Sequence, residues 1–316
     1  MLKTFVRRLL LLVVTLLLVT ILAFVAFSII PGDPTDTILG LNATEEQVAA
    51  LRAQLGLDMP LSARYWDWLT GFVRGDLGDS YNFNMPVTVL LSGRIAPTFT
   101  LTGLAALLII LFSIPLGLFA ARHEGGWVDR TLTVLNQIVM SVPNFVVGIS
   151  LMFLFGLVLR WFQPGGYVSP QQGLGAHLWF MLFPALAVAL PKSAMMIKML
   201  RGSVLSEMSA DYIRTAYSKG NSRASALRRH VLRNAMIPVV TFFATTIAEL
   251  VAGSIVVEQV FTIPGLGQML IASIGNRDYP VVQAIVVLLA AWIMIVNFIA
   301  DLMSRWMDPR RREESL

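Results

Sequence analysis

The chain has 316 residues, of which 56% are hydrophobic and 14% charged, and its mean hydropathy is +0.71. Soluble domains carry about 25% charged residues, so this composition excludes an ordinary water-soluble fold. The sequence contains no cysteine, which excludes disulfides, a cysteine nucleophile and a thiolate metal site. Its net charge of +5 is typical of the charge that sets topology in membrane proteins, and we expect no nucleic acid partner.

The N-terminus predicts a first transmembrane helix within residues 1–30. Three basic residues, Lys3, Arg7 and Arg8, precede an unbroken apolar run of 22 residues at 9–30. The core of a signal peptide has about 7–15 apolar residues, and here Pro31-Gly32-Asp33-Pro34 follows the run where a cleavage site would be. We therefore predict an uncleaved helix rather than a signal peptide.

Residues 31–96 are predicted to form a helical extracytoplasmic segment. Thr44 followed by Gln47 is a capping pattern, so a short amphipathic helix is expected after Thr44. A second helical stretch at 63–73 carries aromatic side chains that favour the headgroup level, so it is expected on the membrane surface or over the bundle. These side chains are Tyr65, Trp66, Trp68 and Phe72.

Five further spans complete the membrane domain. Runs at 99–121, 131–159, 235–257 and 281–303 are each long enough to cross about 30 Å of hydrocarbon. A run at 178–200 is interrupted by two prolines and two lysines, but omitting it would place nine basic residues between Lys192 and Arg233 outside. With six spans, 18 Lys and Arg lie inside against 6 outside, as the positive-inside rule requires.

We therefore predict an all-α integral membrane fold with six transmembrane helices and both termini in the cytoplasm. Five of these helices form a core at 97–308, and 309–316 form a cytoplasmic tail. Prolines within the spans predict kinked helices, because proline removes a helix hydrogen bond. They are Pro115, Pro143, Pro184 and Pro238.

The cytoplasmic segment 201–234 is long, basic and helical in pattern. Residues 211–220 predict a helix that ends at Gly220, the residue that most easily adopts a left-handed cap. A second basic helix is expected from Ser222. Physical reasoning alone predicts a short helical hairpin inside the membrane, and an ordinary basic loop is the alternative.

This segment resembles the coupling loop of binding-protein-dependent peptide and nickel permeases, the membrane subunits of ATP-binding-cassette importers. The resemblance rests on Tyr212-Ile-Arg-Thr-Ala-Tyr-Ser-Lys-Gly220 and on His230-Val-Leu-Arg-Asn-Ala-Met-Ile-Pro238. Other stretches follow the family's order over some 280 residues: Pro31 to Pro34, Leu55-Gly-Leu-Asp58, Gly75-Asp-Leu-Gly78, Pro115-Leu-Gly117, Val260-Phe261, Pro264-Gly-Leu-Gly267, Arg277-Asp-Tyr-Pro280 and Asp308-Pro-Arg310.

The resemblance implies a type I importer permease whose short helix docks in a groove of a separate ATPase subunit. The coupling residues would be Tyr212, Arg214, Thr215, Ala216 and Gly220. Ala216 would allow close helix contact and Gly220 a sharp exit. Where many relatives have Ala-Arg-Ala-Lys-Gly, this chain reads Ala-Tyr-Ser-Lys-Gly, which leaves a charged contact to the ATPase open.

The resemblance also implies the partners. They are a second homologous permease, two ATP-binding subunits and an extracytoplasmic substrate-binding protein, all at a bacterial inner membrane. The sequence has no Gly-x-x-x-x-Gly-Lys-Ser/Thr phosphate loop, so ATP and Mg²⁺ are expected on the partner ATPase subunits. We expect no cofactor and no metal site in this chain.

Polar residues within the spans are candidates for the substrate pathway, because buried charge in a membrane usually faces a cavity or a partner. Glu249 and Asn144 are the two candidates. Glu249 could attract a cationic substrate or metal chelate, or it could be satisfied by a neighbouring helix. Asn144 could equally be interhelical glue, and Asp301 is expected to pair with Arg305.

The outer loop at 258–280 is a candidate gate or contact for the binding protein, with a simple structured loop as the alternative. Its candidate residues are Pro264, Gly265, Gly267, Arg277 and Asp278.

The function predicted is a permease subunit for imported peptides, with nickel or a metal chelate as the alternative cargo. A secondary transporter would usually show internal repeats and several intramembrane carboxylates, and the sequence shows neither. An intramembrane enzyme is not expected, because the chain has no His-Glu-x-x-His or Gly-x-Ser-x-Gly motif and its three histidines fall in loops or at a membrane edge.

Overall fold

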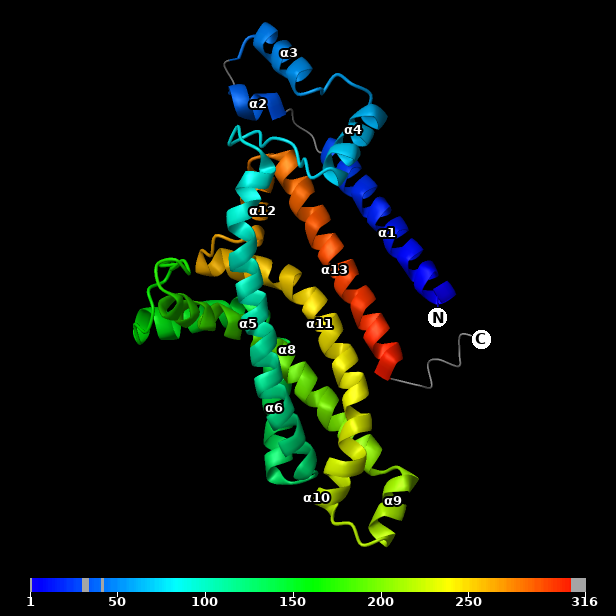
Figure 1. Cartoon of the computed structure of the whole chain (residues 1–316). Coiled ribbons are helices and arrows are strands. Elements are labelled where there is room, and N and C mark those ends of the chain that lie inside the picture. Colours follow the sequence, from blue (N-terminus) through cyan, green and yellow to red (C-terminus); the bar gives the residue numbers. More distant parts are fainter. Residues whose placement is uncertain (1, 30–33, 41–42, 308–316) are drawn as a thin grey trace. The chain divides into compact units, whose positions relative to one another are not determined.

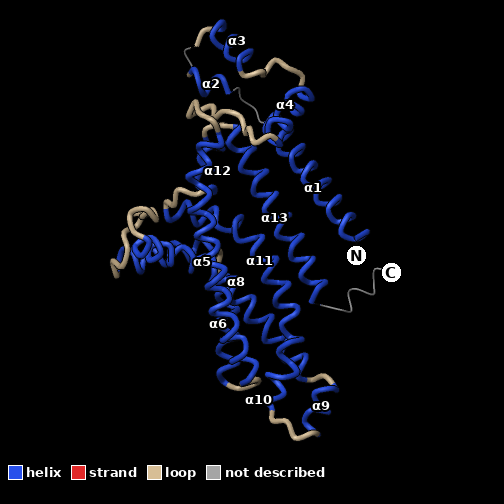
Figure 2. The backbone as a smooth tube through the Cα atoms, viewed as in Figure 1, coloured by secondary structure: helices blue, strands red, loops and turns tan. Residues whose placement is uncertain are grey.

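The computed structural model describes residues 2–29, 34–40 and 43–307, and within them the chain is helical with no strand (Figure 2). Two expected features, most of the Pro31 to Pro34 stretch and the tail at 309–316, lie outside the described residues. The chain forms two compact units. Unit 1 comprises Met1–Thr98 and Pro264–Ile295, and unit 2 comprises Phe99–Ile263 and Val296–Leu316.

The helices confirm the predicted all-α membrane fold. Five are long and apolar enough to span a membrane, and a bent pair makes a sixth span if it is counted as one. The five are α1 (Leu2–Ile29), α5 (Val87–Arg122), α8 (Leu174–Met208), α11 (Leu232–Phe261) and α13 (Tyr279–Met307). The bent pair is α6 (Trp127–Ser141) with α7 (Asn144–Leu151) and its π-helical continuation η1 (Met152–Val158).

The bend in this pair occurs at Pro143. The two helices meet at 99°, so the single span expected at 131–159 is broken into two helices. Val142 is extended, with φ −93° and ψ 125°, because the proline ring disfavours a helical conformation in the residue before it. Pro184 and Pro238 lie inside continuous helices, so only one of these three prolines ends a helix.

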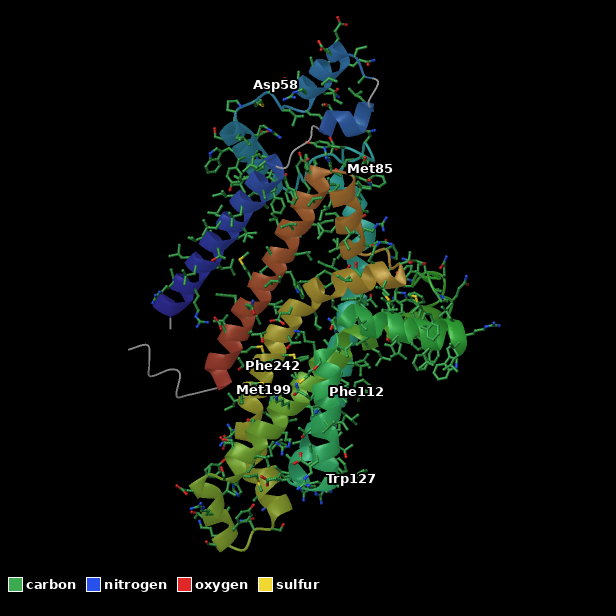
Figure 3. All side chains as sticks on the ribbon, turned by 180° about the vertical axis from the view of Figure 1, so that it is seen from behind. Asp58, Met85, Phe112, Trp127, Met199 and Phe242 are labelled. Atoms are coloured by element: carbon green, nitrogen blue, oxygen red, sulfur yellow. The ribbon has the colours of Figure 1, made fainter. Side chains whose placement is uncertain are left out.

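Unit 2 is built around α8 (Figure 1). In the most apolar stretch of α8, 72% of the residues are buried, against 17–39% in the corresponding stretches of the other four long helices. Helix α8 packs against α6, α7 and α11. Met199 of α8 and Phe242 of α11 mark this packing in Figure 3. A Cβ atom on Gly117 would lie 2.8 Å from Cδ2 of Leu200, so any larger residue there would force the Leu200 side chain of α8 to move.

Unit 1 carries the short helices of the expected extracytoplasmic segment. They are α2 (Pro34–Leu39), α3 (Glu45–Gln54) and α4 (Leu61–Val73), and α12 (Leu266–Gly275) belongs to the same unit. The capping box before α3 is confirmed, because the Gln47 amide donates to Oγ1 of Thr44 at 3.3 Å and the Thr44 amide to Oε1 of Gln47 at 3.1 Å.

Aromatic packing fixes α4 on the first transmembrane helix. The Tyr65 ring meets the Phe24 ring edge-on with centroids 5.5 Å apart, and the Tyr65 hydroxyl shares a 2.9 Å hydrogen bond with Thr20 of α1. Trp68 lies 6.0 Å from Phe24 on the same side. Two of the aromatic residues that the sequence marked in α4, Tyr65 and Trp68, therefore pack on the C-terminal half of α1.

Candidate functional site

The segment predicted to be cytoplasmic, at 201–234, forms the predicted helical hairpin in unit 2. Helix α9 (Asp211–Ser218) is followed by α10 (Arg223–Ala226) and the π-helical turn η2 (Leu227–Val231), which leads into α11. Gly220 ends α9 with φ +81°, and its amide donates to the Tyr217 carbonyl at 2.8 Å. A glycine in the left-handed region is the usual way to close a helix, so this exit is sharp and well defined.

Helix α9 has one buried edge and one open face. Ile213 is fully buried and Ala216 is 7% exposed, three residues apart on the edge that faces the core of unit 2. The residues between and around them are exposed: Tyr212, Arg214, Thr215, Tyr217, Ser218 and Lys219. The short helix is thus held along a narrow edge and presents a polar, aromatic face. Contact of this face with an ATPase stays a prediction.

Side-chain hydrogen bonds fix α9 to both neighbouring helices. The Tyr212 hydroxyl donates to the Glu207 carboxylate near the end of α8 and accepts from the Asn234 amide of α11 at 3.3 Å. Burial and the hydrogen bond to Glu207 raise the pKa of the Tyr212 phenol above its usual value. Asn221 adds a 3.1 Å bond to the Ala216 carbonyl. These contacts fix α9 to α8 and α11 and leave its open face exposed.

A buried ion pair that the sequence reasoning missed lies between Asp129 and Arg201. Nε of Arg201 donates to Oδ1 of Asp129 at 2.5 Å and its Nη2 to Oδ2 at 2.7 Å, while the Gly125 amide donates to Oδ2 at 2.9 Å. The Asp129 side chain is only 4% exposed. The pair joins the α5–α6 turn to α8, at the same end of unit 2 as α9 and α10 (Figure 1).

A signal for this pair was present in the sequence. Asp129 lies two residues before the apolar run at 131–159, and Arg201 directly follows the run at 178–200. Two opposite charges at the same predicted membrane face are candidates for pairing. Their separation by 72 residues gave no local pattern that would identify the partners.

The two pathway candidates come close to one stretch of α11. Nζ of Lys192 on α8 lies 2.6 Å from Oε2 of Glu249, and the Glu249 side chain is 62% exposed while that of Lys192 is 22% exposed. One helical turn further along α11, a Cβ atom added to Gly253 would lie 3.7 Å from Nδ2 of Asn144, so the Asn144 side chain approaches α11 at this glycine. Glu249 is therefore paired with a neighbouring helix, as one of the two sequence readings expected. A pathway role for Glu249 and Asn144 stays a prediction.

In unit 1, Asp278 organises the loop before α5. Its carboxylate accepts hydrogen bonds from the Ser80 hydroxyl at 2.5 Å and from the Tyr81 and Asn82 amides at 3.0 and 3.4 Å. The Phe83 amide in turn donates to the Ser80 hydroxyl at 3.0 Å. Asp278 is fully buried, so it holds this loop in place of presenting its carboxylate at the surface.

The other candidates from the outer loop lie around α12. Gly265 precedes the first residue of α12, and the Leu266 amide donates to Oγ1 of Thr98 at 2.8 Å. Pro264 and Gly267 flank this contact, and Arg277 is exposed with φ +56°. A role of these residues as a gate or a binding-protein contact stays a prediction. The expected Asp301 pairing cannot be followed, because the Arg305 side chain lies outside the described residues.

Asp278→Asn is expected to loosen the loop at 80–83. An asparagine places an NH₂ group against donors, which leaves a buried donor unsatisfied at a cost of about 1–3 kcal/mol. Hydrogen exchange of the Tyr81 and Asn82 amides should therefore rise at least tenfold in the purified variant. Asp79→Asn, at an exposed neighbouring carboxylate, is the control. Unchanged exchange in Asp278→Asn would show that the carboxylate does not hold the loop.

Unit 1 also contains an open cavity of about 880 Å³. Its lining combines aromatic residues of α1, α4 and α13 with charged residues of α3, α4 and the loop that follows α4. They include Phe24, Arg64, Asp67, Trp68, Asp79 and Tyr279. The lining therefore combines aromatic surface with charged groups of both signs.

Sequence comparisons cover nearly the whole chain. Residues 113–313 match the family "Binding-protein-dependent transport system inner membrane component", and residues 1–102 match the N-terminal family of the same membrane components. The Sinorhizobium fredii protein named "Probable peptide ABC transporter permease protein y4tP" is 36% identical, over 97% of this chain and 98% of its own length. The "Glutathione transport system permease protein GsiC" of Salmonella choleraesuis is 37% identical, over 99% of both chains.

A solved structure shares the fold. A chain from inward-facing conformations of the MetNI methionine ABC transporter superposes with a TM-score of 0.54 and 20% identity, covering 69% of this chain and 96% of that chain. The full-length relatives, the two family matches and this shared fold agree with one another. The chain belongs to the family of inner-membrane components of binding-protein-dependent transport systems, as the permease subunit of an ATP-binding-cassette importer.

Proposed function

We propose that this chain forms half of a peptide translocation pathway, together with a second homologous permease. The observation that carries the coupling part of the proposal is α9, a short helix fixed along one edge with its polar face open. The peptide cargo is supported by relatives named for peptide and glutathione transport that are 36–37% identical over nearly full length. A substrate-binding protein delivers the cargo on the outer side.

Two ATP-binding subunits supply the energy in this proposal. They hold ATP and Mg²⁺, and this chain contributes no catalytic residue and no cofactor. The open face of α9 docks on one of them through Tyr212, Arg214 and Thr215, while Ala216 and Gly220 set the position of the helix. Both termini then lie in the cytoplasm of a bacterial cell, which agrees with the excess of basic residues in the segments assigned to that side.

On the outer side, the binding protein contacts unit 1. The exposed Arg277 and the mixed lining of the unit 1 cavity support this contact, since interfaces of transient partners are polar at the rim and carry aromatic residues within. The Pro264-Gly265-Leu266-Gly267 turn positions α12 in the same unit.

Nickel or a metal chelate is the second candidate cargo, and one contact disfavours it. The sequence left open whether Glu249 attracts a cation or pairs with a neighbouring helix, and Lys192 lies 2.6 Å from its carboxylate. A carboxylate that is already paired with a lysine attracts a free cation only weakly. The two charges of the pair can each interact with a cargo that carries both signs of charge. The Lys192–Glu249 pair therefore favours a peptide as the cargo over a metal ion.

Affinity purification of this chain from its native membrane in mild detergent tests the assembly. We expect a second permease and ATP-binding subunits to co-purify, as identified by mass spectrometry. The assembly in proteoliposomes should take up peptides only with ATP and the binding protein present. Recovery of the chain alone, with transport intact after ATP depletion, would instead indicate a secondary carrier.

A further inference from the structure

The Lys192–Glu249 pair lies at a depth where exposed charge needs an explanation. Lys192 is near the midpoint of α8, and Glu249 is in the central part of α11. A charged side chain at this depth is expensive in hydrocarbon and normally faces a protein partner or a water-filled cavity. More than half of the Glu249 side chain is exposed, so the surface around it is expected to face the pathway or the second permease and not lipid.

The neighbours of the pair along α11 have small side chains. On α11, Thr245 and Gly253 lie one turn before and one turn after Glu249, on the same face of the helix. The Thr245 hydroxyl donates to the Phe242 carbonyl of its own helix, and Gly253 has no side chain. The Asn144 amide approaches at Gly253. The face therefore offers one ion pair and one amide, with small neighbours.

The need of each charge for a counter-charge limits which cargo can separate the pair. Lys192 and Glu249 neutralise each other, and the Lys192 side chain is only 22% exposed, so separating the pair would leave the lysine charge poorly solvated unless an anion replaces Glu249. A cargo that separates the pair must therefore bring a cation for Glu249 and an anion for Lys192 together. A peptide with free ends has both, as an α-ammonium and an α-carboxylate.

We propose that the Lys192–Glu249 pair opens to receive the two charged ends of a peptide, with the ammonium on Glu249 and the carboxylate on Lys192. This assignment rests on the proposed function in peptide import. It makes the pair a selective subsite of the permease itself, so cargo with a blocked end is disfavoured after delivery as well as by the binding protein.

Uptake by the reconstituted importer gives the first test, with tri-alanine and N-acetyl-tri-alanine as the probes. Each uptake rate is compared at saturating binding protein, whose affinity for both probes is measured separately. The neutral double variant Lys192→Met/Glu249→Gln should lose uptake of tri-alanine roughly tenfold, because two charge-assisted contacts are removed. Its uptake of the N-acetylated probe should change much less, so the preference for free ends shrinks.

The matched control is Lys198→Met, which removes an exposed lysine from the same helix. Its preference for free ends should stay at the wild-type value. The reversed variant Lys192→Glu/Glu249→Lys keeps a pair of opposite charges and should regain part of the preference. A double neutral variant with wild-type uptake and unchanged preference would overturn the subsite.

A direct binding readout is available because the chain has no cysteine. Ala252→Cys places one thiol of this subunit on an exposed position three residues from Glu249. A membrane-impermeant thiol reagent should modify it, and millimolar tri-alanine should slow the modification at least threefold, while N-acetyl-tri-alanine amide should not. Leu111→Cys, on an exposed apolar stretch of α5, should stay unmodified.

The outcomes separate the two proposals. If Ala252→Cys is inaccessible, or if the blocked peptide protects it as well as tri-alanine does, the subsite is refuted while peptide import can stand. If the wild-type assembly takes up no peptide with ATP and the binding protein present, the proposed function fails and the subsite fails with it. Protection that disappears in the Lys192→Met/Glu249→Gln background supports the subsite.

Discussion

Asp129→Asn is expected to lower the free energy of unfolding of unit 2 by about 2–4 kcal/mol. Removing one member of a buried ion pair typically costs 3–5 kcal/mol, and the lower range applies because the Arg201 side chain is 30% exposed. The variant keeps one acceptor oxygen, but it loses the bidentate contact and leaves the arginine charge without a counter-ion. Thermal unfolding of the purified chain in detergent, followed by a tryptophan signal, measures the loss.

The exposed pair between Arg52 and Asp58 provides the control. Its atoms are 3.5 Å apart and its side chains are 44% and 60% exposed, so Asp58→Asn should change stability by less than about 1 kcal/mol. Figure 3 shows Asp58 on the loop between α3 and α4. Equal thermal shifts in Asp129→Asn and Asp58→Asn would contradict a structural role for the buried pair.

The position of the Asp129–Arg201 pair also predicts an effect on transport. Arg201 lies near the C-terminal end of α8, and only Ser209 and Ala210 separate α8 from α9. Loosening α8 at this end removes the support on which α9 is mounted. Uptake by the assembled importer should therefore fall in Asp129→Asn at temperatures where the variant is still folded.

Local features of this fold could be predicted from the sequence, because each depends on residues a few positions apart. Thr44 and Gln47 form the expected capping box, and Gly220 closes α9 in the left-handed conformation. The length of an apolar run likewise predicts a span, since the bilayer thickness sets the number of residues. These signals are contained within a single helix or turn.

Contacts between distant residues could not be predicted in this way. The Ser80–Asp278 bond joins residues 198 positions apart, and nothing in either local pattern identifies the other. Asp278 consequently looked like a surface candidate, although it is buried. The helix expected at 211–220 is present as α9, which ends at Ser218, while the coupling role of its residues stays a prediction. The sequence reasoning missed Asp129, Arg201 and Lys192 as partners.

Tertiary packing also explains the two spans whose sequence was ambiguous. The run at 178–200 is interrupted by two prolines and two lysines, yet α8 is the most buried of the five long apolar helices among the described residues. At Pro143 the pattern predicted a kink but not its angle. Neighbouring helices can re-satisfy the backbone groups freed at a proline, so the surroundings decide whether a helix continues, as at Pro184, or breaks.

Ala216→Arg is expected to uncouple transport from ATP hydrolysis while leaving the chain in the membrane. Ala216 is 7% exposed on the narrow edge that holds α9, so an arginine there must displace the helix or bury a charge. Either outcome moves the open face of α9 relative to α8. Peptide uptake should fall by roughly tenfold or more, while ATP hydrolysis by the purified assembly stays within about a factor of two.

Substitutions at Gly220 should give a graded version of the same effect. Gly220→Ala strains the backbone at φ +81° by about 1 kcal/mol and should reduce uptake only partly. Gly220→Pro cannot adopt this φ and loses the 2.8 Å bond to the Tyr217 carbonyl, so it should abolish uptake. The order wild type, alanine, proline in uptake, at equal amounts of membrane-inserted chain, is what a mechanical role for this exit requires. Normal uptake in both Gly220→Pro and Ala216→Arg would refute the assignment of α9 as the coupling helix.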